Sequence, residues 1–327
     1  MNRRHFLSLS LATAASASCR RKPVAADAPV RFGHFPNITH VQALVASQLS
    51  FLGNGWFEKR LGVPVQWFTY NAGPSATEAI FSGSLDVTYI GPSPVLNAYA
   101  RSAGKEIRIL SGAANGGSSI VVRPEAGIKT IMDLKGKRIA TPQLGNTQDV
   151  QLRALLKENG FTVTQTGGDV TIIPTPNADL TNLFQQGMLD AAWAPEPFAS
   201  ILELEQQAQN LLQDTETNVT MLVSSVAFLK DRPALGAQVT TAHHELTRWV
   251  TANPVESRSL LAGALKRLTS REPKPAVLEK ALARVVLTNS LSRPSLEKMA
   301  HNAIAAGFLK DVPSLDQLLS SMTPPAS

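Results

Sequence analysis

The chain has 327 residues, of which 43% are hydrophobic and 17% charged, a composition that is ordinary for a globular protein and excludes a wholly disordered one. This length predicts two domains. The net charge of +6 is spread along the chain, apart from Arg20-Arg21-Lys22, whereas a nucleic-acid-binding protein usually gathers such charge on one face.

Residues 1–18 have the composition of a secretory signal. Arg3 and Arg4 precede an uncharged run of 12 apolar or small residues, 6–17. A helix needs about 20 apolar residues to span a bilayer, so this run is too short to be a membrane anchor. The paired arginines resemble a twin-arginine export signal.

Cys19 is the only cysteine, which excludes an internal disulfide and a Cys/His metal set. Its place after the signal resembles the lipid-attachment site of bacterial lipoproteins, although Ser16 stands where that motif normally has a large aliphatic residue. We expect lipidation at Cys19; the alternative is an incidental cysteine in a signal that is cleaved elsewhere. Residues 19–29 are expected to form a tether.

From Val30 onward, strand-like and helix-like patterns alternate. Runs rich in β-branched and aromatic residues predict strands, and apolar residues three and four apart predict helices. Strands are expected at residues 30–34, 63–70, 86–90 and 107–110, and helices at 39–51, 76–82 and 93–100. This alternation predicts βαβ units in an α/β fold with a mainly parallel sheet.

The alternation begins again after the glycine-rich segment 115–119. Strands are expected at 120–123, 138–140, 170–173, 190–193 and 221–226, and helices at 147–159, 178–186 and 197–207. Beyond Lys230 the pattern is almost entirely helical to Leu319. We infer two lobes joined by two crossover segments, with residues 30–116 in the first, 117–222 in the second, and 223–327 returning to the first.

Sequence motifs of enzymes are sparse. Segment 133–138 lacks the glycine spacing and the Ser or Thr of a phosphate-binding loop, and the chain contains no G-x-G-x-x-G, G-x-S-x-G or H-E-x-x-H sequence. The segment His243-His244-Glu245 comes nearest to a metal-ligand cluster. Adjacent helical residues point in different directions, so we expect a solvated helix face there.

Polar turns follow several of the expected strands. In an open α/β sheet, ligands lie beyond the carboxyl ends of the strands, where helix N-termini present free N–H groups. Such turns fall at 35–40, 90–94, 115–119, 141–148 and 193–197. Backbone amides and neutral side chains there would hold an oxyanion without an arginine. The same residue types also cap helices and end strands, which is the purely structural explanation for each turn.

Trp193 and Glu196 lie in the last of these turns. Trp193 is either a core residue or an aromatic wall against a ring or aliphatic part of a ligand. For Glu196 three roles stay open: binding a cationic group, orienting Trp193, or contacting the opposite lobe.

Ordered motifs at 35–40, 71–75, 83–92, 133–142, 144–149 and 193–197 resemble those of periplasmic substrate-binding proteins of ABC importers for aliphatic sulfonates, nitrate or taurine. The resemblance covers about residues 30–310 and is strongest to the aliphatic-sulfonate branch. It implies a two-lobed periplasmic-binding-protein fold of type II with a ligand in the cleft. Carried over position by position, its binding loops fall on Asn37, Thr39, Pro92, Ser93, Ser118, Ser119, Asn146, Thr147, Gln148, Trp193 and Glu196.

The resemblance further implies a monomer that captures a small oxyanion, an aliphatic sulfonate above all, by lobe closure and delivers it to an importer permease and its ATPase. It implies no cofactor, metal or enzymatic activity, and a location in the periplasm or at the outer face of the cytoplasmic membrane.

Several alternatives stay open. The ligand is otherwise nitrate, taurine or a thiamine-precursor pyrimidine. A pyrimidine-synthesis enzyme shares the fold, but it carries a cysteine-rich motif, whereas this chain has Cys19 alone. A lipid-anchored sensory domain that acts through a partner protein is a third reading.

Overall fold

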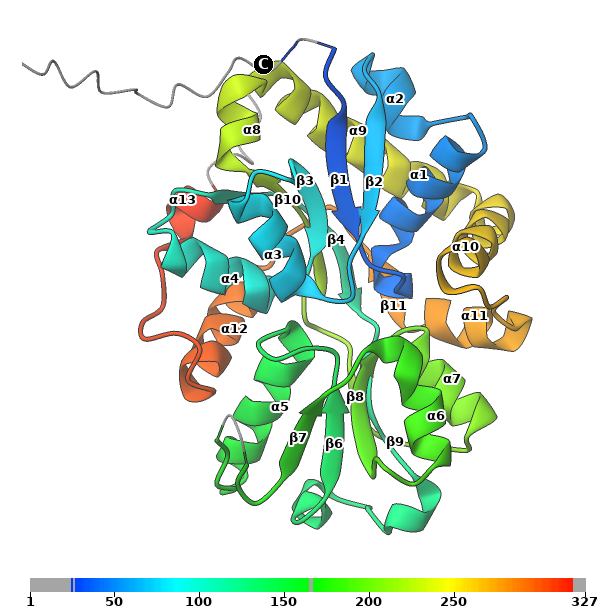
Figure 1. Ribbon diagram of the computed structural model, residues 1–327, viewed down its shortest axis with the longest axis vertical. Coiled ribbons are helices and arrows are strands. Elements are labelled where there is room, and N and C mark those ends of the chain that lie inside the picture. The colour runs from blue at the N-terminus through cyan, green and yellow to red at the C-terminus, as the bar shows by residue number, and fades with distance from the viewer. Residues whose placement is uncertain (1–24, 26, 165–166, 320–327) are drawn as a thin grey trace, which may run out of the picture.

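The computed structural model describes residues 25, 27–164 and 167–319. The export signal and Cys19, with most of the tether, lie outside the described residues. Two β-sheets with flanking helices lie one above the other, and strands near the middle of the molecule connect them (Figure 1). The predicted α/β class with two lobes is confirmed.

The upper sheet in Figure 1 has six strands, and its neighbouring strands are, in order, β11 (Val285–Leu287), β4 (Ile107–Gly116), β10 (Thr220–Ser225), β3 (Val87–Ile90), β1 (Val30–His34) and β2 (Val65–Thr69). The lower sheet has five, in the order β7 (Thr171–Pro174), β6 (Arg138–Thr141), β8 (Ala191–Pro195), β5 (Ser118–Val122) and β9 (Gln209–Asp214). We call these the first and second sheets.

Most strands of each sheet run in one direction, with their carboxyl ends toward the other sheet. In the first sheet β1 pairs in parallel with β2 and β3, and in the second β6 pairs in parallel with β7 and β8. The strands β10 and β5 are inserted antiparallel to their neighbours. The chain enters each of these two strands from the opposite sheet. Each strand therefore starts at the edge of its sheet where the parallel strands end.

The first passage between the sheets takes a single residue, Gly117, which lies between β4 and β5. Its φ of +75° is in the left-handed region that favours glycine. A Cβ on Gly117 would lie 2.9 Å from the Cγ2 of Thr39 and 2.5 Å from that of Val285. The chain returns between β9 and β10, through residues 215–219.

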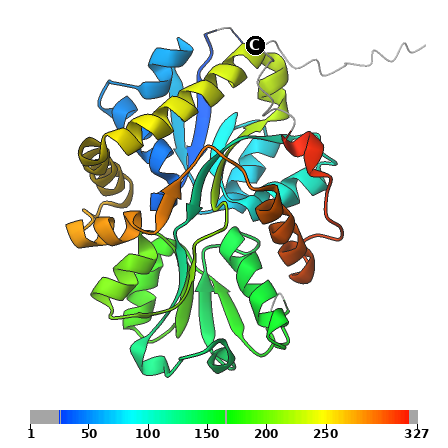
Figure 2. The ribbon, with the colours of Figure 1, turned by 180° about the vertical axis from the view of Figure 1, so that it is seen from behind.

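Helices cover both faces of the first sheet (Figure 2). One face packs on α1 (Val41–Phe51), α2 (Trp56–Leu61), α9 (Pro233–Ala252) and α10 (Pro254–Thr269). The other packs on α3 (Gly73–Phe81), α4 (Pro92–Arg101), α12 (Arg293–Ala305) and α13 (Leu315–Leu319). Two further helices precede α9 and follow α10, namely α8 (Val226–Asp231) and α11 (Pro275–Leu282).

The second sheet is covered by three helices. On one face lies α5 (Thr147–Glu158), and on the other lie α6 (Leu180–Gln185) and α7 (Phe198–Glu205). Short 3-10 helices complete the chain at η1 (Ile38–His40), η2 (Pro124–Ala126), η3 (Ile131–Leu134) and η4 (Asn177–Asp179).

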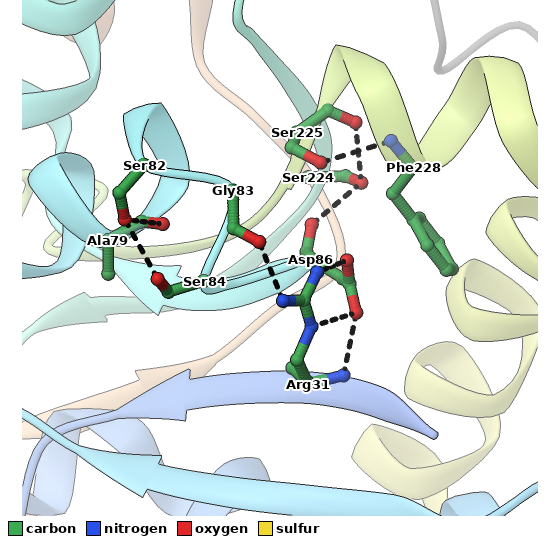
Figure 3. Close-up of polar contacts among 9 residues, drawn as sticks. All are labelled: Arg31, Ala79, Ser82, Gly83, Ser84, Asp86, Ser224, Ser225 and Phe228. Carbon is green, nitrogen blue, oxygen red and sulfur yellow. Dashed lines mark hydrogen bonds and ion pairs between the residues drawn. The ribbon is translucent and has the colours of Figure 1, made fainter. Parts of the chain in front are cut away.

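An arginine at the start of a strand anchors each sheet in the same way. In the first sheet, the Nε of Arg31 donates to Asp86 Oδ2 at 3.0 Å, and its Nη1 donates to the carbonyl of Gly83 (Figure 3). In the second, the Nε of Arg138 donates to Asp190 Oδ2 at 3.0 Å. Both aspartates end a Gly-x-Leu-Asp segment, so the two sheets share one βαβ building plan.

The expected solvated face at His243 is wrong. The imidazole of His243 is fully buried and bonds Tyr89 Oη at 2.9 Å through Nδ1 and the carbonyl of Gly112 at 2.8 Å through Nε2. This histidine lies on the side of α9 that packs on the first sheet, while the neighbouring Glu245 pairs with Arg60. Among the described residues, no group of His, Cys, Asp and Glu is arranged to hold a metal, and no helix is long and apolar enough to cross a membrane.

Candidate ligand-binding site

A pocket lies where the carboxyl ends of strands from both sheets meet. The turns after β1, β2 and β3 line it from one side, and the turn after β6 and the last residue of β8 line it from the other. Its cavity volume is about 30 Å³, which is room for a water molecule and well below the range of small-molecule sites, so a larger ligand requires the two sides to move apart. Its lining includes Phe35, Asn37, Thr39, His40, Asn71 and Gly91 from the first sheet and Pro142, Asn146, Thr147, Gln148 and Pro195 from the second.

Hydrogen bonds across the pocket join the two sides directly. The N–H of Ile38 donates to the carbonyl of Glu196 at 2.7 Å, and the Nδ2 of Asn71 donates to the carbonyl of Pro142 at 3.0 Å. Because each bond joins a turn of one sheet to a turn of the other, the structure holds the two lobes in contact around the pocket.

The pocket brings together the predicted site residues Asn37, Thr39, Asn146, Thr147 and Gln148. These follow β1 in the first sheet and β6 in the second, so residues more than 100 positions apart face one space. The reasoning from turns at strand ends thus places them correctly in space; their role in binding stays a prediction.

The predicted residues on two other turns are absent from this lining. Pro92 and Ser93 begin α4, and the Oγ of Ser93 donates to the carbonyl of Gly145 at 3.1 Å, which is another contact between the lobes. Ser118 accepts a hydrogen bond from the indole of Trp193 at 3.2 Å. Ser119 is fully buried, and its Oγ has no partner within the described part of the chain.

Trp193 and Glu196 also point away from the pocket lining. Trp193 is 4% exposed and belongs to the core between the second sheet and α5. The carboxylate of Glu196 accepts hydrogen bonds from Arg284 at 2.9 Å and from the N–H of Ser200 at 3.1 Å. Of the three roles considered for Glu196, the structure therefore selects contact with the opposite lobe.

Helices begin at the pocket on both sides. Gly73 at the start of α3 and Thr147 at the start of α5 both line it, as does Pro94 in the first turn of α4. The positive ends of the helix dipoles therefore face this space. No Lys, Arg, Asp or Glu lines the pocket within the described residues, so any anion there is held by dipoles and neutral donors.

A buried ion pair, which no sequence pattern predicted, shapes the turn before α5. Asp149 is fully buried; its carboxylate accepts from the N–H of Gly145 at 2.9 Å, from Thr141 Oγ1 at 3.0 Å and from Arg153 Nε at 3.0 Å. The side chain of Asn146 caps the helix by accepting from the N–H of Asp149 at 2.9 Å. This network fixes the turn that presents Asn146 to Gln148.

His40 lines the pocket and was not among the predicted site residues, although its turn was. Its ring packs on that of Phe35, with the centroids 4.5 Å apart. Burial lowers the pKa of His40 well below its usual value, and the nearby His34 acts in the same direction. The imidazole is therefore neutral at physiological pH.

The NMT1-like family model matches residues 24–266. A binding protein of Brucella abortus strain 2308 is 27% identical over 274 residues, which are 81% of this chain and 80% of that protein. The taurine-binding periplasmic protein of Escherichia coli K12 is 29% identical over 163 residues, 49% of this chain and 47% of its own length.

Solved structures are similar over most of the chain. The alkanesulfonate-binding protein from Xanthomonas axonopodis pv. citri, solved bound to MOPS, matches with a TM-score of 0.72 at 23% identity, covering 90% of this chain and 99% of that one. At this identity the likeness establishes a shared fold.

Proposed function

The chain belongs to the NMT1-like family, and we propose that it is the extracytoplasmic solute-binding component of an ABC importer. It captures a small oxyanion, an aliphatic sulfonate above all, when its two lobes close, and it delivers the ligand to the permease and its ATPase. It performs no chemistry of its own.

One observation carries this proposal: a pocket lined from both lobes by helix starts and neutral polar groups. Asn37, Thr39 and His40 on one side, and Thr147 and Gln148 on the other, supply hydrogen-bonding groups suited to an anion whose charge is spread over several oxygens. A ligand that touches both sides stabilises the closed state. In this proposal residues 30–116 and 223–327 form one lobe and 117–222 the other.

Isothermal titration calorimetry of the mature protein tests the ligand class. We expect an alkanesulfonate to bind with micromolar or tighter affinity, and nitrate and sulfate to bind more weakly. Loss of that binding on mutating Thr147 to Val, without loss of thermal stability, is expected if the pocket is the site. Absence of measurable binding for every oxyanion would refute the proposed function.

A neutral heterocycle is the second candidate, because no charged side chain lines the pocket among the described residues. Without a cation, a ring with several hydrogen-bonding atoms is recognised by the same amides and hydroxyls. The same calorimetry with a thiamine-precursor pyrimidine separates the two candidates. The first predicts binding of the alkanesulfonate only, and the second predicts binding of the pyrimidine only.

We also propose export by the twin-arginine-like signal of residues 1–18 and lipid attachment at Cys19. The proposal rests on the sequence alone, because these residues lie outside the described part. Two or three acyl chains anchor a protein firmly, whereas one does not. Mass spectrometry of the mature N-terminus tests it: a lipid on Cys19 is expected, and a bare N-terminus beyond Cys19 would contradict it.

A further inference from the structure

Two polar side chains at the pocket have no hydrogen-bond partner among the described residues. They are Asn37, through its Oδ1, and His40, through its Nδ1. Asn37 is 6% exposed and His40 is 2% exposed, and both line the pocket. A buried polar group without a partner costs about 1–3 kcal/mol. A bound ligand that pairs with both groups would remove this cost.

The local backbone turns both side chains to one side. Asn37 is the N-cap of η1 and His40 is its last residue, so one short turn carries both side chains to the pocket. An asparagine at an N-cap ordinarily accepts from a nearby backbone N–H, but the side chain of Asn37 makes no such bond. The N–H of His40 donates instead to the carbonyl of Asn37 at 2.9 Å.

The same chain contains satisfied counterparts of both residues. Asn146, the N-cap of α5, accepts from the N–H of Asp149 at 2.9 Å and donates to the side chain of Gln148 at 2.8 Å. His243 is also fully buried, and both of its ring nitrogens have partners. Asn37 and His40 therefore differ from these two counterparts, and both line the pocket.

The charges around the pocket restrict which kind of hydrogen-bond donor on a ligand can pair with Asn37 Oδ1. The carboxylates next to lining residues are Asp149 and Glu196, and they are paired with Arg153 at 3.0 Å and Arg284 at 2.9 Å. An ammonium group in the pocket would find no free carboxylate among its lining residues, and burying an unpaired charge is costly. A neutral donor, such as a hydroxyl, meets the amide oxygen without that cost.

We propose that Asn37 and His40 select a sulfonate that carries a neutral hydrogen-bond donor close to its oxyanion. The N–H of the neutral His40 imidazole donates to a sulfonate oxygen, and Asn37 Oδ1 accepts from a hydroxyl of the same ligand. This selectivity rests on the proposed function: that function gives the ligand its sulfonate group, and the selectivity adds a hydroxyl group next to it.

Calorimetry with three probes of matched size tests the selectivity: 2-hydroxyethanesulfonate, ethanesulfonate and 2-aminoethanesulfonate. We expect the hydroxyl compound to bind about tenfold more tightly than ethanesulfonate, as one added hydrogen bond implies, and the ammonium compound to bind most weakly. Equal affinity for the first two would overturn the selectivity while leaving the proposed function intact. If none of the three probes and no other oxyanion binds, both the selectivity and the proposed function are overturned.

Substitutions assign the selectivity to the two residues. In Asn37→Ala the preference for the hydroxyl compound should vanish, while ethanesulfonate still binds. In Asn37→Asp the order should invert in favour of 2-aminoethanesulfonate, because a carboxylate then faces the ammonium. In His40→Phe, which keeps the ring, all three affinities should fall about tenfold or more. An unchanged order in both Asn37 variants contradicts the assignment.

The matched control is the capping asparagine of the second lobe. Asn146→Ala should lower the midpoint of thermal unfolding, since loss of a cap costs about 1 kcal/mol. Asn37→Ala should leave that midpoint unchanged or raise it, because it removes an unpartnered buried group. A fall in stability as large as that of Asn146→Ala would show that Asn37 serves the fold.

Discussion

The carboxylate of Glu196 on the second lobe accepts a hydrogen bond from the guanidinium of Arg284 on the first at 2.9 Å. Arg284 lies between α11 and β11, and it also donates to both oxygens of Glu203 in α7, at 2.8 and 2.9 Å. All three side chains are at most 13% exposed. Burial raises the pKa of Glu196, while its bonds to Arg284 and Ser200 oppose that shift. This cluster ties the end of β8, where Pro195 lines the pocket, to the first lobe.

Replacing Arg284 by Met should open the lobes of the free protein. The change leaves the buried carboxylate of Glu196 without a counter-ion, while Glu203 keeps its pair with Lys280, and breaking a buried pair costs about 3–5 kcal/mol. Separation of the lobes hydrates the Glu196 carboxylate, so the cost should appear as opening, with a larger radius of gyration in small-angle X-ray scattering and weaker ligand binding. Arg101→Met is the control, because its pair with Glu78 is about 60% exposed and lies within one lobe. An unchanged radius in Arg284→Met would contradict this prediction.

Gly91 is the place where one methyl group should hinder closure without harming the fold. A Cβ there would lie 2.3 Å from Thr147 Oγ1 on the opposite lobe and 3.3 Å from the carbonyl of Val219. The backbone of Gly91, with φ of −78°, suits any residue, so Gly91→Ala introduces no backbone strain.

We expect Gly91→Ala to bind ligand at least tenfold more weakly than wild type, with little change in the midpoint of thermal unfolding. Gly33→Ala is the contrasting variant, because its Cβ would meet Leu85 and Thr88 at 2.7 Å inside the first lobe. Overpacking of a core costs about 1–3 kcal/mol, so this variant should lose stability. Wild-type affinity in Gly91→Ala would show that closure tolerates the added methyl group.

The α/β class was predictable because buried strands such as β3 are rich in β-branched residues and are followed by Gly and Pro. The edge strand β9 was not predicted, since its sequence Gln209–Asp214 is mostly polar and pairs only with β5. The second half of β4 consists of small residues that resemble a loop, yet it is a strand because β10 and β11 pair with it on either side.

The site was predictable to the level of its turns. The turns after β1 and β6 meet because parallel strands end at the same edge of a sheet, and this brought Asn37 and Thr147 into one pocket. The role of Glu196 depended on Arg284, 88 positions away, and no local pattern identifies such a partner. His40 was missed for a similar reason: a sequence does not indicate which buried polar groups lack partners.

The buried pair of Asp149 and Arg153 should be essential for the second lobe. Arg153 is 1% exposed and also donates to the carbonyl of Thr164 at 2.7 Å. Arg153→Met would leave the Asp149 carboxylate buried without a counter-ion, which costs about 3–5 kcal/mol. Urea unfolding should show this loss, and the double variant Asp149→Asn with Arg153→Met should recover part of it. A single variant as stable as wild type would contradict the prediction.

The buried histidines should make the free protein sensitive to mild acid. Burial lowers the pKa of His34 to about 4 and that of His243 to about 3, from 6.5 in an unfolded chain. Well above pH 6.5 both are neutral in both states, and their contribution to stability is complete. As the pH falls from 6.5 toward 4, the two imidazoles are protonated in the unfolded chain but stay neutral in the folded state. Each histidine then removes about 1.4 kcal/mol of stability per pH unit.

Urea unfolding at pH 7.5, 6.5, 5.5 and 5.0 measures this loss. The variant His243→Gln should lose stability at every pH, because it breaks the bonds to Tyr89 and Gly112, but its decline between pH 6 and 5 should be shallower by about 1.4 kcal/mol per pH unit. The raised pKa of Glu196 gives a contribution of opposite sign in this range, and the comparison cancels it because both proteins carry that residue. Parallel declines would mean that His243 is not the group whose protonation the folded state resists.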